Sequence, residues 1–234
     1  MYQQLSPNML KTFKECPRKF DFKYLQDIQM PVNDEIFEFG KNIHALASYY
    51  LRGENIDKME KSLSKKESEV WTYLKSCKYF GYEVVNTEYN LAVRIGKHFF
   101  GGRLDALVKN GDKYYILDYK TGSAPKNPKY DYQTMIYTLC VKKFFRTDDV
   151  TFVYLDLKNR EEVCIPFSKE TEDDFINRLL EVSKKIDNYE SAPKKQECIK
   201  SENPDQKNSN NESAASDTQN NLYPRRCEYS IICY

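Results

Sequence analysis

Two acidic residues and a lysine in the middle of the chain have the types and spacing that metal-assisted hydrolysis requires. Asp105 ends the run GGRLD, and Asp118 precedes Lys120 by two residues in LDYKTG. Because side chains alternate faces along a strand, Asp118 and Lys120 should point the same way. An Asn-Gly-Asp turn at 110–112 predicts a hairpin that brings the Asp105 strand beside them. Two carboxylates and an ammonium at one spot could hold Mg²⁺ or Mn²⁺, polarise a phosphodiester and orient an attacking water.

The same residues also have a simpler interpretation. Taken alone, an Asp-x-Lys at the end of a strand is more often a solvent-exposed ion pair than a metal site. Here the apolar run 114–117 leads directly into it, which is typical of a buried strand. From this stretch alone, both interpretations remain open.

Other polar residues lie on elements that could bring them to this spot. His44 falls in a predicted helix over 34–51 that Gly53 ends, and it borders the apolar face of that helix. Such a histidine can be a core residue with a backbone partner or a metal ligand. Glu88 precedes the first predicted hairpin strand, as an accessory acid or as a strand-edge charge.

A predicted helix over 128–145 places Gln133 and Tyr137 one turn apart on a single face. This is also the pattern of an ordinary amphipathic helix with an apolar core side. The remaining predicted elements are a helix opening at Ser6-Pro7 and broken at Pro17, a helix over 55–80, a three-stranded meander over 82–119, a hairpin of 150–157 with 162–167, and a helix over 169–189.

Six segments, in this order, resemble the motifs of one nuclease family. They are LSPNMLKTFKECPRKFDFKYL, FGKNIHALASYYLRG, GGRLD, LDYKTG, YDYQTMIYTL and RRCEYSIIC. Together they resemble the PD-(D/E)xK nuclease superfamily and, within it, the RecB-like exonuclease branch, which includes recombination helicase nuclease domains and CRISPR-associated exonucleases. The order and approximate spacing hold over nearly the whole chain.

The resemblance implies a fold and a set of residue roles. The fold is α/β with a restriction-endonuclease-like core, in which a central mixed sheet with an antiparallel meander is flanked by helices. His44, Asp105, Asp118 and the carbonyl of Tyr119 would bind the divalent ion, Lys120 would orient the water, Gln133 and Tyr137 would position the substrate, and Glu88 would be an accessory acid.

The function that follows is a metal-dependent DNA nuclease, expected to be an exonuclease in repair, recombination or defence. A helicase or a CRISPR-type protein would be its partner. The alternative is a non-catalytic nucleic-acid-binding or scaffolding subunit of a helicase-nuclease complex. Degenerate members usually lose an acid or the lysine, whereas Asp105, Asp118 and Lys120 are all present here. A hydrolase acting on RNA or nucleotides at the same site is a third reading.

The cysteines raise the question of a [4Fe-4S] cluster. Many RecB-like nucleases hold one with an early cysteine and a C-terminal Cys-x₂-Cys-x₅-Cys. Cys16, Cys227 and Cys233 match three of these positions, but Pro224 stands at the fourth, and Cys198 is the nearby substitute. The alternative is free thiols, and Cys77, Cys140 and Cys164, each in an apolar stretch, are expected to be free thiols in the core.

Length and composition set the remaining bounds. The 234 residues carry a net charge of +1, so no global basic field attracts nucleic acid. A polar N-terminus, the absence of an apolar run long enough for a bilayer, and seven cysteines without a disulfide pattern predict a cytoplasmic protein with no membrane role. We expect a nuclease domain over 1–190, a disordered polar loop over 191–221, and a cysteine-containing tail over 222–234 that packs back on the first helix.

Overall fold

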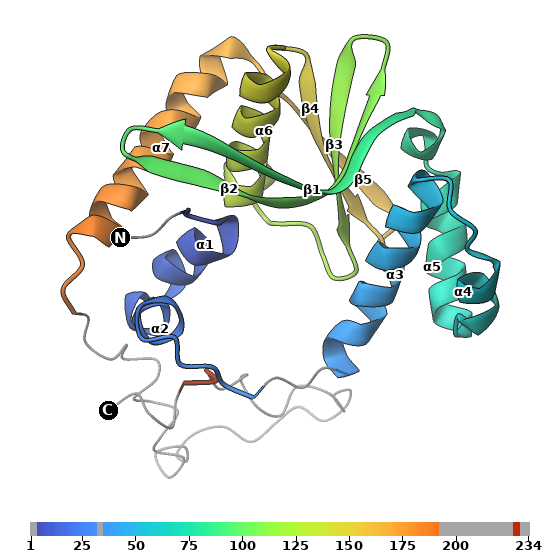
Figure 1. The fold of residues 1–234 in the computed structure, drawn as a ribbon, viewed down its shortest axis with the longest axis horizontal. Coiled ribbons are helices and arrows are strands. Elements are labelled where there is room, and N and C mark those ends of the chain that lie inside the picture. The colour runs from blue at the N-terminus through green and yellow to red at the C-terminus, as the bar shows by residue number, and fades with distance from the viewer. Residues whose placement is uncertain (1–3, 32–34, 192–226, 230–234) are drawn as a thin grey trace, which may run out of the picture.

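The computed structural model describes residues 4–31, 35–191 and 227–229. Within them the chain forms a central five-stranded sheet in the order β1-β2-β3-β4-β5, with helices on both faces (Figure 1). The strands are β1 (Glu83–Ile95), β2 (His98–Asn110), β3 (Lys113–Lys120), β4 (Val150–Asp156) and β5 (Glu161–Pro166). The fold is the α/β, mixed-sheet arrangement that the sequence predicts.

The first three strands form an antiparallel meander, and β4 then joins β3 in parallel. Glycines with positive φ close both tight turns, Gly96 at +61° and Gly111 at +60°, a conformation that glycine adopts without strain. Helix α6 (Tyr132–Phe145) makes the crossover between β3 and β4, and β5 pairs antiparallel with β4 at the sheet edge.

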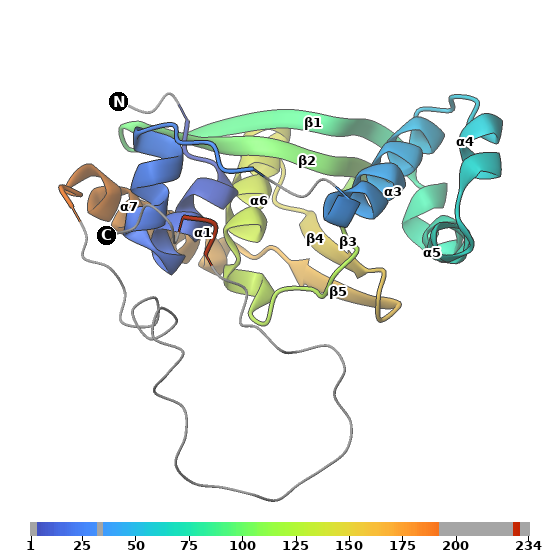
Figure 2. The ribbon, with the colours of Figure 1, turned by 90° about the horizontal axis from the view of Figure 1, so that it is seen from below.

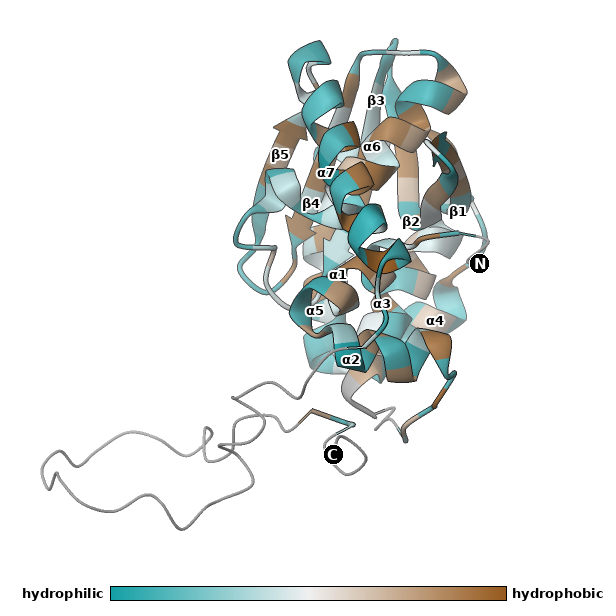
Figure 3. Cartoon of the chain, turned by 90° about the vertical axis from the view of Figure 1, so that its left-hand side faces the viewer, coloured by the Kyte–Doolittle hydropathy of each residue, from teal (hydrophilic) through white to brown (hydrophobic). Residues whose placement is uncertain are grey.

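Two apolar cores lie on opposite faces of the sheet because successive side chains of each strand alternate. One core joins the sheet to α1 (Pro7–Glu15), α6 and α7 (Lys169–Asp187). The other joins it to α3 (Glu35–Leu51) and α5 (Lys65–Ser76). Figure 2 shows α1 and α7 toward one end of the long β1–β2 hairpin, α3 and α5 toward the other, and α6 between them. The outward side of α7 is hydrophilic, as expected for a surface helix (Figure 3).

One predicted helix is divided in the structure. The predicted helix over 55–80 consists of α4 (Asp57–Ser62), α5 and a 3₁₀ turn at Lys78–Gly81. Ser64 separates α4 from α5, because its side chain caps α5 and Glu67 completes the capping box. Pro17 ends the first helix as predicted, and it opens α2 (Pro17–Phe20).

The N-terminal segment and residues 227–229 contact each other although they are far apart in sequence. The ring of Tyr229 stacks on Phe22 with centroids 5.7 Å apart, and its hydroxyl donates to the carbonyl of Ile28 at 2.9 Å. Lys19 forms an ion pair with Glu228 at 3.1 Å. The rest of the predicted loop and tail lies outside the described residues. No described helix is long and apolar enough to cross a membrane.

Candidate metal centre

The candidate site lies where β2 and β3 separate. Their last paired residues at this end are Ala106 and Leu117. Beyond that pair, Oδ2 of Asp105 accepts the backbone N–H of Tyr119 at 2.8 Å. A carboxylate thus binds the N–H group that would otherwise lack a partner where the two backbones diverge. This hydrogen bond holds Asp105 at the mouth of the opening.

Asp118 and Lys120 lie together on one face of β3, as strand alternation predicts. Nζ of Lys120 is 2.7 Å from Oδ2 of Asp118. The Asp118 side chain is almost fully buried, while that of Lys120 is about a quarter exposed. The lysine therefore lies between the buried carboxylate and solvent.

Gln133 connects this pair to the start of α6. Its Oε1 accepts from Nζ of Lys120 at 2.7 Å, and its Nε2 donates to Oδ1 of Asp118 at 3.0 Å. Asp131 caps the helix by accepting the Gln133 N–H at 2.9 Å. Asp131 thus fixes the start of α6, and the side-chain amide of Gln133 fixes the side chains of Asp118 and Lys120.

His44 reaches the same opening from α3. Its Nδ1 is 3.2 Å from Oδ1 of Asp105, and its Nε2 is 2.9 Å from the carbonyl oxygen of Tyr119. Burial alone lowers the pKa of His44, but the hydrogen bond to Asp105 and the charges of Asp105 and Asp118 outweigh it and raise the pKa. An imidazolium, which carries a proton on each nitrogen, satisfies both contacts.

Asp118 is a buried carboxylate that lies near a second one. Burial and the negative charge of Asp105 raise its pKa to about 6, against the opposing effects of Lys120 and His44. Its buried Oδ2 lies 2.7 Å from Nζ of Lys120 and has no hydrogen bond of good geometry among the described residues. Carboxylate oxygens, an imidazole and a backbone carbonyl can all bind a divalent cation, so the residues around this opening fit one.

Glu88 also reaches the site, from inside β1 rather than from before it. One ligand atom each of His44, Glu88 and Asp105 lie within 4.8 Å of one another, the one such group among the described residues. Glu88 has φ +50° and falls between the paired residues Thr87 and Tyr89. This left-handed backbone is strained for a residue with a side chain, and here it turns the carboxylate toward His44 and Asp105.

Tyr137 shares a face of α6 with Gln133 but lies behind the site. Its ring is buried, and its hydroxyl donates to the carbonyl of Arg103 at 3.1 Å. A Cβ added to Gly102 would lie 2.9 Å from this hydroxyl, so the tyrosine packs directly on the β2 backbone. Tyr137 thus supports the strand that carries Asp105.

Arg103 was not singled out from the sequence, yet it borders the site. Its Nε is 2.8 Å from Oε2 of Glu88, and its side chain is about two-thirds exposed. The sequence could have indicated this residue, because Arg103 and Asp105 are two residues apart on one strand and so share a face.

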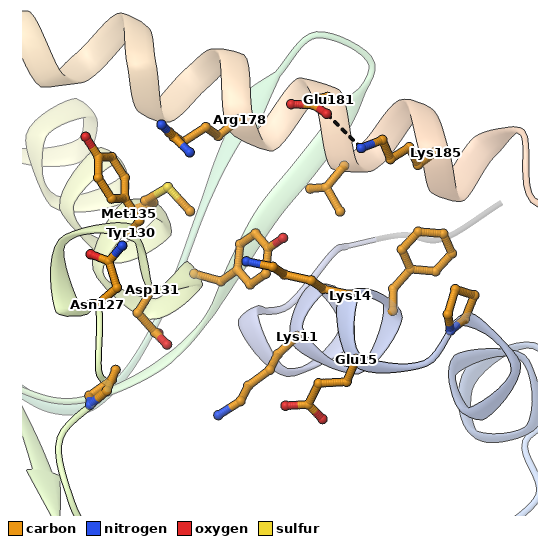
Figure 4. A pocket seen from close by; sticks show the side chains of 15 residues that line it. Lys11, Lys14, Glu15, Asn127, Tyr130, Asp131, Met135, Arg178, Glu181 and Lys185 are labelled. Carbon is orange, nitrogen blue, oxygen red and sulfur yellow. Dashed lines mark hydrogen bonds and ion pairs between the residues drawn. The ribbon is translucent and has the colours of Figure 1, made fainter. Parts of the chain in front are cut away.

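An open cleft of about 890 Å³ leads to these residues from between α3 and the β1–β2 strands, lined among others by His44, Glu88, Arg103 and Asp105. A second cavity, of about 790 Å³, lies between α1, the segment before α6, and α7 (Figure 4). It mixes both charge signs, with Lys11 and Lys14 facing Asp131 and the Glu181–Lys185 pair.

The cysteines divide into two groups. Cys77 and Cys140 are buried as expected, but Cys164 is exposed, which corrects its assignment to the core. It lies on the edge strand β5, where Val163 and Ile165 pack against the main core and Cys164 faces away. Cys16 accepts the Lys19 N–H at 3.4 Å as a helix cap.

Cys227 packs beside Phe22 and Tyr229. Cys198 and Cys233, the other two candidate cluster ligands, lie outside the described residues.

A family model described as the PD-(D/E)XK nuclease superfamily matches residues 4–234. A search of curated proteins found no match.

Two solved structures are similar to the chain. One is a candidate exonuclease from Eubacterium rectale, with 10% identity, a TM-score of 0.49, and coverage of 77% of this chain and 81% of that one. Another is SSO0001, with 17% identity, a TM-score of 0.40, and coverage of 85% and 82%.

Proposed function

The chain belongs to the PD-(D/E)XK nuclease superfamily, and on that premise we propose that it is a divalent-metal-dependent DNA nuclease, an exonuclease of the RecB-like branch. The observation that carries the proposal is the pair of contacts where β2 and β3 separate, His44 to Asp105 at 3.2 Å and Lys120 to Asp118 at 2.7 Å. The order of the six sequence motifs supports the RecB-like assignment and, with it, a helicase or CRISPR-type partner.

The proposed ligands of Mg²⁺ or Mn²⁺ are His44, Asp105, Asp118 and the carbonyl of Tyr119, with Glu88 as an accessory acid. When bound, the ion supplies Lewis-acid activation of the phosphate and lowers the pKa of a bound water. The buried Oδ2 of Asp118, whose contact is the ion pair with Lys120, supports this ligand set.

The proposed role of Lys120 is to orient the attacking water and to stabilise charge that develops on the phosphorane. Its ammonium is partly exposed and already held by Asp118 and by Gln133. A donor that is fixed before the reaction needs little reorganisation during it. Gln133 would thus position Lys120 rather than touch the reacting atoms.

The test is cleavage of DNA by purified variants. Asp118→Asn or Lys120→Ala should lower turnover about a thousandfold or more, because each removes a group that acts on the transition state. Far-ultraviolet circular dichroism should show that both variants fold. The matched control is Lys113→Ala, at the other end of β3, where the lysine pairs with the exposed Asp149 at 3.6 Å.

Substrates should include single-stranded DNA, duplex DNA and RNA, each with Mg²⁺, with Mn²⁺ and with chelator. Full cleavage by Asp118→Asn, or cleavage that persists in chelator, would reject the proposed metal site. Wild-type protein that binds DNA and cuts nothing would instead favour the non-catalytic subunit.

A further inference from the structure

One face of α3 lines the cleft that leads to the proposed metal site. The residues of this face recur at helical spacing and are Phe37, Lys41, His44, Ala45, Ser48, Tyr49 and Arg52. The opposite face carries Ile43, Leu46 and Ala47 into the core beneath the sheet. Packing therefore fixes α3 so that the first set of side chains faces the cleft.

Two aromatic rings on this face are exposed to an unusual degree. Phe37 is 52% exposed and Tyr49 is 38% exposed. Tyr50, which is also on α3, differs because its ring packs against Trp71 and Phe80. Phe37 has no aromatic partner in the part of the chain that the structure describes. Its ring is thus available to a ligand.

Cations border the same rings. The guanidinium of Arg52 lies 4.8 Å from the ring centroid of Tyr49, and Lys41 and Arg103 line the cleft as well. Arg52 and Arg103 form ion pairs with Glu54 and Glu88, but both arginine side chains remain substantially exposed. Exposed pairs of this kind are weak, so a phosphate can replace the carboxylate at little cost.

We propose that this face of α3 is a stacking surface for unpaired nucleotides of the strand being cut, with Phe37 and Tyr49 as base platforms. The inference rests on the proposed function. Along the helix, Phe37 and Tyr49 lie about 10 Å and about 7 Å from His44, in opposite directions. A strand that follows α3 would thus bring a phosphate to His44 and Asp105 and a base to each ring.

Paired bases in a duplex present no free face to such rings, whereas an unpaired base can stack on them. Arg52 would support a base on Tyr49 through its own planar group and would contact the backbone phosphate. The surface therefore favours a strand that is single or that has been separated at its end.

The test is binding of a short single-stranded DNA that contains 2-aminopurine, in Ca²⁺, with the strand shown to be intact afterwards. Stacking on a ring should quench the fluorescence of the wild-type complex. Phe37→Ala and Tyr49→Ala should each weaken binding about tenfold and reduce the quenching, which is the usual loss for one stacked base. Phe37→Trp should restore both.

The matched control is Phe144→Ala. Phe144 is 61% exposed but lies outside the cleft. A second control uses a strand with abasic positions, which wild type and Phe37→Ala should bind equally well. Blunt duplex should bind all variants alike.

Two results would overturn the inference and leave the proposed function standing. One is wild-type protein that cuts DNA while Phe37→Ala and Tyr49→Ala bind the single strand normally. The other is a loss of binding in Phe144→Ala equal to that in the two cleft variants. Wild-type protein that cuts no nucleic acid, while the two cleft variants lose binding and quenching, would reject the proposed function and support the stacking surface.

Discussion

The carboxyl group of Asp118 is buried beside a second carboxylate, so its ionisation is unfavourable until a cation arrives. Its pKa is raised to about 6, and the pKa of His44 is raised as well. For both groups the folded protein holds the proton more tightly than the unfolded chain does. Their contribution to stability is therefore full at low pH and is lost as the pH rises through the folded pKa.

The first prediction is that metal-free protein becomes less stable as the pH rises from about 4 to about 7. Deprotonation of Asp118 alone should account for a loss on the order of 3 kcal/mol, from a shift of about two pKa units. Urea unfolding in chelator at several pH values measures it. Asp118→Asn should flatten the slope, whereas Asp149→Asn, at an exposed position, should leave it unchanged.

Saturating Mn²⁺ should reverse this dependence, because the ion displaces both protons and is bound more tightly as the pH rises. A stability that rises with pH in chelator would contradict the electrostatic account of the site.

At the scale of elements, the start of α6 positions the charged pair of β3. Gln133 holds Lys120 and Asp118 at once, and Asp131 caps the helix two residues earlier. Helix α6, which connects the parallel strands β3 and β4, therefore also fixes Lys120, the proposed water-orienting residue.

The second prediction concerns Gln133→Ala. It should lower kcat about tenfold to a hundredfold with little change in KM, because Lys120 remains present but is less well fixed. A pH–rate profile should shift as well, since Asp118 loses a hydrogen bond. Thr138→Ala, on the same helix and more deeply buried than Gln133, should affect stability but not the pH profile. A change confined to KM would point to a substrate contact instead.

A second element contact fixes α3, and with it His44. The buried Glu67 of α5 accepts from Nδ2 of Asn42 at 2.9 Å and from the backbone N–H of Ser64 at 2.8 Å. Hydrogen bonds from Ser64 and Asn42 lower the pKa of Glu67 below its ordinary value of 4.5.

The third prediction is that Glu67→Ala costs about 1–2 kcal/mol of unfolding free energy, through the lost helix cap and the lost link to α3. Because the pKa of Glu67 is lowered in the folded state, its contribution should be present above pH 4.5 and disappear below it. Urea unfolding at pH 7 and pH 3.5 measures both. Glu69→Ala, exposed on the same helix, is the control. Equal losses in the two variants would refute the assignment.

The elements differ in how far the sequence could predict them. The turns at Gly96 and Gly111 are local, and strand alternation placed Asp118 beside Lys120 without any tertiary information. The division at Ser64 was also readable, because Ser-x-x-Glu before an apolar run is a capping signal. The separation of β2 from β3 beyond the Ala106–Leu117 pair was not, since it depends on how α3 and α6 pack against the sheet.

At the scale of the whole molecule, the two ends of the described chain meet. Phe22 and Tyr229 stack, and Lys19 pairs with Glu228, over a separation of about two hundred residues. The entropic cost of bringing together two points so far apart in sequence grows only slowly with their separation. The proposed domain map, with a nuclease domain over 1–190, a loop over 191–221 and a tail over 222–234, remains a prediction in which Cys227–Tyr229 would be the docking point.

The last prediction separates the two ways in which the tail could be held. If packing alone holds it, Tyr229→Ala should lower the unfolding free energy by about 2 kcal/mol and the melting temperature by a few degrees, and iron should be absent. If a [4Fe-4S] cluster holds it, anaerobically purified protein should be brown, and Cys16→Ser or Cys227→Ser should remove the colour. Cys140→Ser, at a buried position, should keep it.

Cys16 already acts as a helix cap through its sulfur, so a thiol there has a structural role without iron. Colourless, iron-free protein that still cuts DNA would therefore reject the cluster. The unfolding free energy of Tyr229→Ala would then decide whether the contact between the chain ends matters for stability.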